Sequence, residues 1–172
     1  QFIPLAENNG FVRELDKTMF VQVCNFQKKL IEHGITPVPI SVNVSRQLLY
    51  DKSFADYYCN YMKEVDIPAD LVELEITESA FSEGDDFTPA LLNEIRRLGF
   101  KLSMDDFGSG YSSLNMLKEV SANVLKLDMG FLGKTDYVTR SKTIIQSVIE
   151  LSSQLGMNVV AEGVEELEQV DS

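Results

Sequence analysis

Apolar residues recur along the chain in two alternating patterns. Short apolar runs predict strands over residues 37–44, 71–77, 100–105, 123–128 and 157–162. Helical spacing of apolar residues predicts helices over residues 11–34, 53–65, 86–98, 114–120 and 139–155. Gly34, Gly99 and Gly156 stand at or just past the end of three of these helices, where glycine commonly terminates a helix. Strand and helix therefore alternate five times.

This alternation indicates an α/β fold with parallel strands joined by crossover helices. Two architectures fit the pattern, an open doubly wound sheet and a (β/α)8 barrel. Five units are enough for an open sheet, whereas a barrel needs eight strands and about 250 residues. With 172 residues, a barrel would require strands outside the chain.

Each predicted strand is apolar but carries a polar residue late, near its carboxyl end. These residues are, in strand order, Asn43, Glu75 with Glu78 just beyond it, Asp105 and Asp106, Lys126, and Glu162. The carboxyl ends of parallel strands form the ligand site in both candidate folds. We therefore expect these side chains at one rim of the sheet. A single acidic residue there also fits a helix cap or a solvated loop, but five successive strands with the same feature favour a site.

The chemistry of this rim points to divalent metal ions. Clustered carboxylates repel each other and are stable together when cations neutralise them. Carboxylate and amide oxygens suit Mg²⁺ or Mn²⁺. The adjacent pair Asp105 and Asp106 is suited to binding or bridging two metals, the usual apparatus for phosphodiester cleavage. Lys126 would orient a water molecule or offset charge in the transition state.

The charge of the chain excludes several classes of partner. Fifteen Lys and Arg residues stand against 27 Asp and Glu, which gives a net charge of −12. Binding to DNA, RNA or an anionic membrane surface relies on a basic face. A small anionic ligand remains compatible if metal ions invert the local charge. Cys24 and Cys59 form no disulfide framework, and the sequence contains no apolar run of transmembrane length, so we expect a cytoplasmic location or the cytoplasmic part of a membrane-bound sensor.

Segments throughout the chain resemble the EAL domain, a bacterial phosphodiesterase specific for cyclic-di-GMP. They are Phe-Ile-Pro-Leu-Ala-Glu at 2–7, Ser-Val-Asn-Val-Ser at 41–45, Glu-Leu-Glu-Ile-Thr-Glu-Ser at 73–79, the run 105–113, Leu-Lys-Leu-Asp at 125–128 and Val-Ala-Glu-Gly-Val-Glu at 160–165. The resemblance implies one EAL-type domain over residues 1–172. It also implies a modified (β/α)8 TIM-type barrel, of which about five strands are present in this chain.

The resemblance also implies a site and a reaction. Five residues would bind the two metals, Mg²⁺ or Mn²⁺: Asn43, Glu75, Asp105, Asp106 and Glu162. Asp105 would bridge the metals, and Glu162 would also be a candidate base. Lys126 would contact the attacking water or the scissile phosphate. Glu78 would anchor the 105–113 loop, which in this family couples the metal site to the dimer interface. The reaction would open cyclic-di-GMP to linear pGpG by in-line attack on one phosphodiester.

The sequence departs from the family pattern at its ends. The Glu-Ala-Leu strand, with a metal-binding Glu, precedes residues 2–4 in the family, and a strand with a Gln-Gly motif follows the last matching segment. On this alignment two strands before the chain and one after it are missing, so we expect the 172 residues alone to be inactive. Ser109 replaces the more common Thr, and Met129-Gly130 replaces a polar pair.

Two other functions remain open from the sequence. The first is a non-catalytic cyclic-di-GMP receptor or interaction domain, and the second is an unrelated Mg²⁺-dependent barrel hydrolase or lyase. The family resemblance further implies a homodimer, and GGDEF, PAS or receiver modules elsewhere in the same protein.

Overall fold

The computed structural model describes residues 3–51, 53–82, 89–108, 117, 120–128 and 138–164. The chain divides into two compact units. Unit 1 comprises Gln1–Ile76 and Gly84–Leu102, and unit 2 comprises Thr77–Glu83 and Ser103–Ser172. Most of the helix predicted over 114–120 lies outside the described residues, as does the 105–113 segment beyond Gly108.

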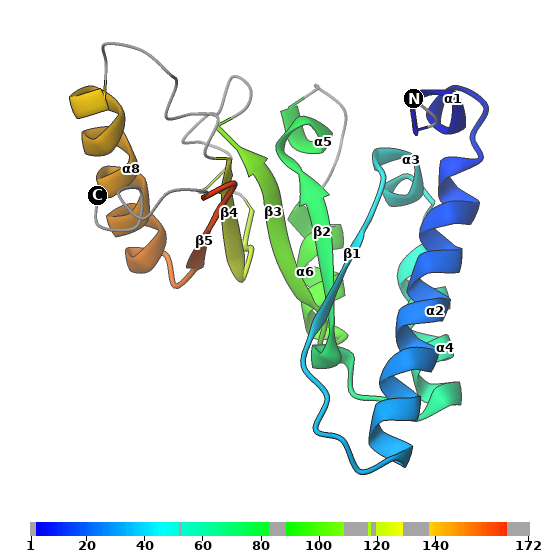
Figure 1. The fold of residues 1–172 in the computed structure, drawn as a ribbon. Helices are drawn as coiled ribbons and strands as arrows, with labels where there is room; N and C mark the ends of the chain where they lie inside the picture. Colours follow the sequence, from blue (N-terminus) through cyan, green and yellow to red (C-terminus); the bar gives the residue numbers. More distant parts are fainter. Residues whose placement is uncertain are drawn as a thin grey trace. The chain divides into compact units, whose positions relative to one another are not determined.

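All five predicted strands are present, with shifted ends. They are β1 (Ile40–Asn43), β2 (Val72–Thr77), β3 (Lys101–Phe107), β4 (Val124–Asp128) and β5 (Asn158–Glu162). The sheet has the strand order β1-β2-β3-β4-β5, which follows the chain (Figure 1). The β1–β2, β3–β4 and β4–β5 pairs are parallel. The fold is therefore α/β with a parallel sheet, consistent with part of a (β/α)8 barrel.

Four of the helices predicted from the apolar spacing are present. They are α2 (Val12–Glu32), α4 (Phe54–Val65), α6 (Pro89–Arg97) and α8 (Val138–Gln154). Gly34, Gly99 and Gly156 follow α2, α6 and α8 with φ values of 71°, 95° and 76°. These positive φ values lie in the left-handed region, which glycine adopts more readily than other residues because it has no Cβ.

Four short elements were not predicted from the sequence. They are α1 (Ile3–Asn8), α3 (Arg46–Leu49), the 3-10 turn η1 (Ala69–Leu71) and α5 (Glu78–Ser82). Periodicity needs a window of about 11–18 residues to be recognised. Elements of one or two turns are too short to show it.

In unit 1, the strands β1 and β2 bury apolar residues at every second position. Val42, Leu74 and Ile76 are buried, and α2 packs against both β1 and α4. Phe20 of α2 lies at the centre of this core, with its ring stacked on Tyr58 of α4 at a centroid distance of 3.6 Å. In β1 the residues on either side of Val42, Ser41 and Asn43, are exposed, whereas in β2 Glu73 is partly exposed and Glu75 is buried. The same alternation that builds the core therefore turns polar side chains to the other face of the strands.

In unit 2, β4 alternates in the same way. Leu125 and Leu127 are buried, whereas Val124, Lys126 and Asp128 are partly exposed. Helix α8 packs against β5, beside which it is drawn in Figure 1. The strand alternation again separates an apolar face from a face that carries charged residues.

Candidate active site

The carboxyl ends of β1 and β2 bring together two of the predicted site residues. Asn43 and Glu75 are register partners in the parallel ladder, so their side chains extend from the same face of neighbouring strands. One step earlier on this face, the Ser41 hydroxyl donates a hydrogen bond to Oε1 of Glu73 at 3.3 Å. Glu75 is buried and Asn43 is exposed. Unit 1 therefore presents an amide and a carboxylate side by side at its strand ends.

The carboxyl end of β3 contains a β-bulge. Met104 pairs with Leu125 but Phe107 pairs with Leu127, so three steps along β3 match two along β4. Asp106, inside the bulge, has a φ of 57°, and its N–H donates a hydrogen bond to Oδ1 of Asp105 at 3.0 Å. Asp tolerates left-handed backbone better than most residues, and bulges redirect side chains next to active sites.

The third strand extends further than the sequence predicted. The sequence placed the end at Asp105, but β3 continues to Phe107, which is buried. Pairing resumes after the bulge because the backbone absorbs the extra residue. The two adjacent aspartates therefore lie within the strand, close to its end.

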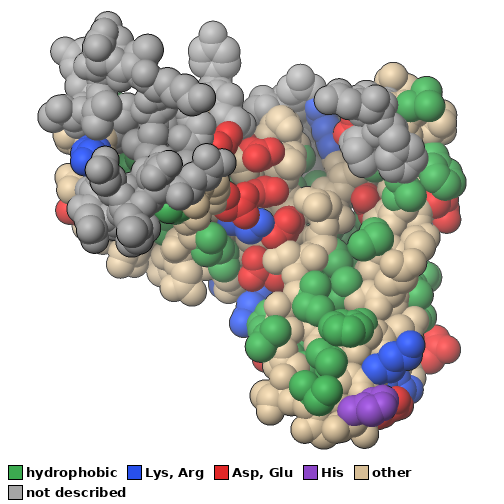
Figure 2. All heavy atoms as spheres, in the orientation of Figure 1, with side chains coloured by type: hydrophobic (Ala, Val, Ile, Leu, Met, Phe, Trp, Pro, Cys, Tyr) green, Lys and Arg blue, Asp and Glu red, His purple; other side chains and the backbone are tan. Residues whose placement is uncertain are grey.

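Lys126 of β4 links the acidic residues of neighbouring strands. Its Nζ lies 3.7 Å from Oδ1 of Asp105 and 2.7 Å from Oε1 of Glu162. The side chains of Lys126 and Asp105 are 15% and 16% exposed, whereas that of Glu162 is 44% exposed. In Figure 2, acidic side chains surround a basic one over the carboxyl ends of β3 and β4. Residues from three strands thus form one charged cluster in unit 2.

Negative charge dominates this cluster. Burial raises the pKa of the Asp106 carboxyl, and the charges of Asp105, Asp128 and Glu162 raise it further. The charge of Lys126 acts in the opposite direction. A carboxyl with a raised pKa for these reasons is stabilised by an additional positive charge, which a bound cation supplies.

Within the described ranges, no three His, Cys, Asp or Glu side chains are arranged as a metal site. The two-metal site therefore stays a prediction from the sequence. The donor set itself fits the predicted ions, because all five proposed ligands are Asn, Asp or Glu and offer hard oxygen atoms.

Glu78 was expected beyond the second strand, and it is the first residue of α5. Its side chain is buried, and its Oε2 accepts a hydrogen bond from the Gly108 N–H at 2.9 Å. Gly108 belongs to the 105–113 run, so Glu78 contacts the segment that it was expected to anchor. The remainder of that run, from residue 109, is outside the described residues.

Sequence reasoning missed one residue near the site. Asp16 of α2 is only 8% exposed, and its Oδ2 accepts a hydrogen bond from the N–H of Ser45, two residues after Asn43. A signal was available, because Asp16 falls on the buried face of the helix with Val12 and Phe20. A charged residue on such a face is uncommon unless it has a partner.

The whole chain, residues 1–172, matches the family model described as the EAL domain. The chain is 35% identical over 170 residues to the cyclic di-GMP phosphodiesterase NbdA of Pseudomonas aeruginosa, a match that covers 99% of this chain and 22% of NbdA. It is 30% identical over 165 residues to the bifunctional diguanylate cyclase/cyclic di-GMP phosphodiesterase MucR of the same organism, covering 96% of this chain and 24% of MucR.

The fold also matches a solved structure, described as the PaMucR phosphodiesterase in complex with c-di-GMP. The TM-score is 0.86 at 29% sequence identity, and the match covers 99% of this chain and 74% of the solved one. The protein therefore belongs to the EAL domain family. The chain spans about a quarter of the length of the two curated relatives named above.

Proposed function

We propose that the protein hydrolyses cyclic-di-GMP to linear pGpG with the help of two divalent metal ions, in bacterial second-messenger signalling. The observation that carries this proposal is the cluster in which Lys126 contacts Asp105 and Glu162, within a chain that matches the EAL family over its whole length. The names of the two curated relatives support the same substrate.

The proposed metal ligands are the five oxygen-bearing residues of the strand ends: Asn43, Glu75, Asp105, Asp106 and Glu162. The ions would be Mg²⁺ or Mn²⁺, because the donors are hard oxygens and include neither His nor Cys. Two observations support this assignment. Asn43 and Glu75 are register partners in unit 1, and the negative surroundings of Asp106 in unit 2 raise the pKa of its carboxyl.

Bound divalent ions would supply Lewis-acid activation of the scissile phosphate and lower the pKa of the attacking water. The chain's own residues have separate tasks. The Lys126 ammonium would contact the water or a phosphate oxygen, where its charge would offset the negative charge of the transition state. Glu162, whose Oε1 lies 2.7 Å from that ammonium, would be the candidate base that accepts a proton. Glu78 accepts a hydrogen bond from the backbone N–H of Gly108, the residue that follows β3, and would thereby anchor the rest of the 105–113 run.

The proposal extends to the partners and location of the protein. We expect a homodimer coupled through the 105–113 loop, and GGDEF, PAS or receiver modules in the longer protein. The name of the MucR relative, which combines a diguanylate cyclase with a cyclic di-GMP phosphodiesterase, supports the presence of a second module in the longer protein. Within the described part of the chain, no helix is long and apolar enough to cross a membrane. Both cysteines are free thiols, which supports a cytoplasmic location.

The test is product analysis on the full-length protein that contains this chain, incubated with cyclic-di-GMP and Mg²⁺ or Mn²⁺. We expect pGpG from the unchanged protein, and none from Asp105→Ala. Asp70→Ala is the matched control, because Asp70 is an exposed acidic residue of η1 and belongs to neither strand-end cluster. Its activity should equal that of the unchanged protein.

Three results would contradict the proposal. Unchanged turnover by Asp105→Ala would remove the metal assignment. Binding of cyclic-di-GMP without release of pGpG would instead identify a receptor. Hydrolysis of other phosphodiesters, with none of cyclic-di-GMP, would point to a different metal-dependent hydrolase.

A further inference from the structure

The chain that leaves β1 is held at two successive residues. The N–H of Val44 donates a hydrogen bond to the carbonyl oxygen of Glu75 at 2.8 Å, which extends the ladder to β2. The next N–H, that of Ser45, donates to Oδ2 of Asp16 at 2.9 Å. Asn43 is the residue just before this pair and the last residue of β1. The path of the backbone beyond Asn43 is therefore fixed from one side by β2 and from the other by α2.

Asp16 is an unusual residue for its position. Its side chain is 8% exposed, and burial raises the pKa of its carboxyl, while hydrogen bonds from the side chain and backbone of Ser45 lower it. The negative charge of Glu7 raises it further. A buried carboxylate costs more free energy than an apolar residue of similar size. General core packing does not account for an acidic residue here, whereas a specific bond to Ser45 does.

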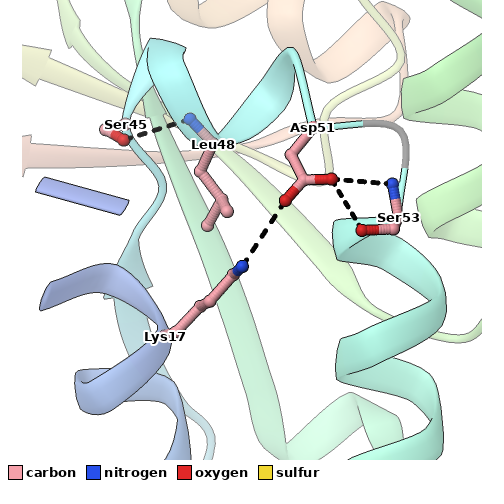
Figure 3. Close-up of polar contacts among 5 residues, drawn as sticks. All are labelled: Lys17, Ser45, Leu48, Asp51 and Ser53. Carbon is pink, nitrogen blue, oxygen red and sulfur yellow. Dashed lines mark hydrogen bonds and ion pairs between the residues drawn. The ribbon is translucent and has the colours of Figure 1, made fainter. Parts of the chain in front are cut away.

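Ser45 also begins the short helix α3. It has extended backbone angles (φ −65°, ψ 151°), and its Oγ accepts a hydrogen bond from the N–H of Leu48 at 3.3 Å (Figure 3). Ser45 is therefore both the last residue of the segment between β1 and α3 and the N-cap of α3. Any shift of Ser45 relative to α2 moves both the start of α3 and the backbone that continues into Asn43.

The far end of α3 has a separate attachment to the same helix. Lys17 Nζ lies 3.4 Å from Oδ2 of Asp51, and Oδ1 of Asp51 accepts hydrogen bonds from the N–H and hydroxyl of Ser53 at 3.0 and 2.6 Å (Figure 3). Consecutive residues of α2, Asp16 and Lys17, thus hold opposite ends of α3. The Lys17 contact is eight residues beyond Asn43 and partly exposed, which makes it a natural control.

We propose that Asp16 is a positioning residue that sets the orientation of Asn43 through the backbone N–H of Ser45. This inference rests on the proposed function, in which the Asn43 amide oxygen is a metal ligand. Loss of residues that orient metal ligands typically weakens metal binding about 10–100-fold. The orientation of Asn43 would depend on the acceptor oxygen of Asp16 and not on its negative charge.

The first test measures Mn²⁺ affinity by isothermal titration calorimetry on the full-length protein. Asp16→Ala should weaken Mn²⁺ binding about tenfold or more, because the N–H of Ser45 loses its acceptor. Asp16→Asn should stay within about threefold of the unchanged protein, because its amide oxygen still accepts that hydrogen bond. Lys17→Met, which releases only the far end of α3, should leave the affinity unchanged.

The second test removes the donor instead of the acceptor. The φ of Ser45 matches that of proline, so Ser45→Pro removes the N–H without a change of φ. Ser45→Ala is its matched control, because it loses the hydroxyl cap but keeps the N–H. Ser45→Pro should weaken Mn²⁺ binding to the same degree as Asp16→Ala, and Ser45→Ala should not. This pair also decides the question if Asp16→Ala fails to fold.

The outcomes separate the two proposals. If the unchanged protein binds no Mn²⁺, the proposed function is wrong and the role of Asp16 falls with it. If the unchanged protein binds Mn²⁺ and folded Ser45→Pro or Asp16→Ala binds it equally well, only the role of Asp16 is wrong. Equal weakening by Lys17→Met or Ser45→Ala would likewise overturn it, because the loss would then come from general loosening of α3.

Discussion

Replacement of Lys126 by Met tests the charged cluster of unit 2 most directly. Met retains the length and apolar stem of Lys but removes the ammonium group, which lies 3.7 Å from Asp105 and 2.7 Å from Glu162. Three acidic residues, Asp105, Asp106 and Glu162, would then lose the positive charge that partly compensates them.

The exposure of the side chains sets the size of the effect. Two unit charges 4 Å apart interact by about 1 kcal/mol in water and about 4 kcal/mol at an effective dielectric constant of 20. The Lys126–Asp105 pair is 15% and 16% exposed and so lies between these limits. Glu162 is 44% exposed, so its contact is worth little more than a surface ion pair. Because Met also avoids the desolvation cost of the ammonium, we expect a net loss of about 1–3 kcal/mol in metal-free protein.

Catalysis should suffer more than stability. If Lys126 contacts the water or phosphate, its removal should lower kcat about 10²–10³-fold, the range observed for the loss of one preorganised electrostatic contact. Mn²⁺ binding should persist, because Lys126 is not a ligand and its removal makes the cluster more negative.

The assays are urea unfolding in EDTA, Mn²⁺ titration calorimetry and steady-state release of pGpG, all on the full-length protein. Lys101→Met serves as the control, because Lys101 is a partly exposed Lys at the opposite end of β3 and should change none of the three quantities. A kcat for Lys126→Met within tenfold of the unchanged protein, at normal Mn²⁺ affinity, would refute the catalytic role of Lys126. Equal unfolding free energies in EDTA would refute the electrostatic reasoning.

Three further predictions concern other parts of the chain. Phe20→Ala should lower the unfolding free energy by about 3–5 kcal/mol in urea denaturation, because Phe20 is fully buried and stacks on Tyr58; a loss below about 1 kcal/mol would contradict the packing. Glu78→Ala should lower kcat more than Glu78→Gln in steady-state assays, because only Gln can still accept the Gly108 N–H; equal losses would contradict the anchoring role. Because burial raises the pKa of Asp16, its stabilising contribution is complete below the unfolded-state pKa and is lost as pH rises through the raised one. The unfolding free energy of the unchanged protein and of Asp16→Asn should be measured in urea between about pH 4 and about pH 7. The stability of Asp16→Asn relative to the unchanged protein should increase as the pH rises. A stability difference that does not change with pH would contradict the prediction.

The chain order of long elements could be predicted from the sequence because each depends on a local pattern. Helices α2, α4 and α8 show their apolar spacing over three or more turns. The strands appear as short apolar runs between them. Helix α3, with four residues, is different, because its caps and its contacts with α2 define it more than any repeat along the chain.

The candidate site was predictable in composition but not in detail. The polar residues at the strand ends were visible because parallel strands are otherwise apolar. The β-bulge at Asp106 was not visible, because a bulge is a property of two paired strands and not of one segment. The contacts of Lys126 with Asp105 and Glu162 also needed the strand order, since they join residues that are far apart in the sequence.

The sequence by itself determined the α/β class, the parallel arrangement, the family and the residue types available for chemistry. These depend on local periodicity and on the identity of residues at strand ends. Only the tertiary structure decided that Asn43 lies opposite Glu75, that Glu78 holds Gly108 and that Asp16 holds Ser45. Such contacts depend on register and on side-chain direction, which are fixed when distant segments pack together and backbone N–H groups find their acceptors.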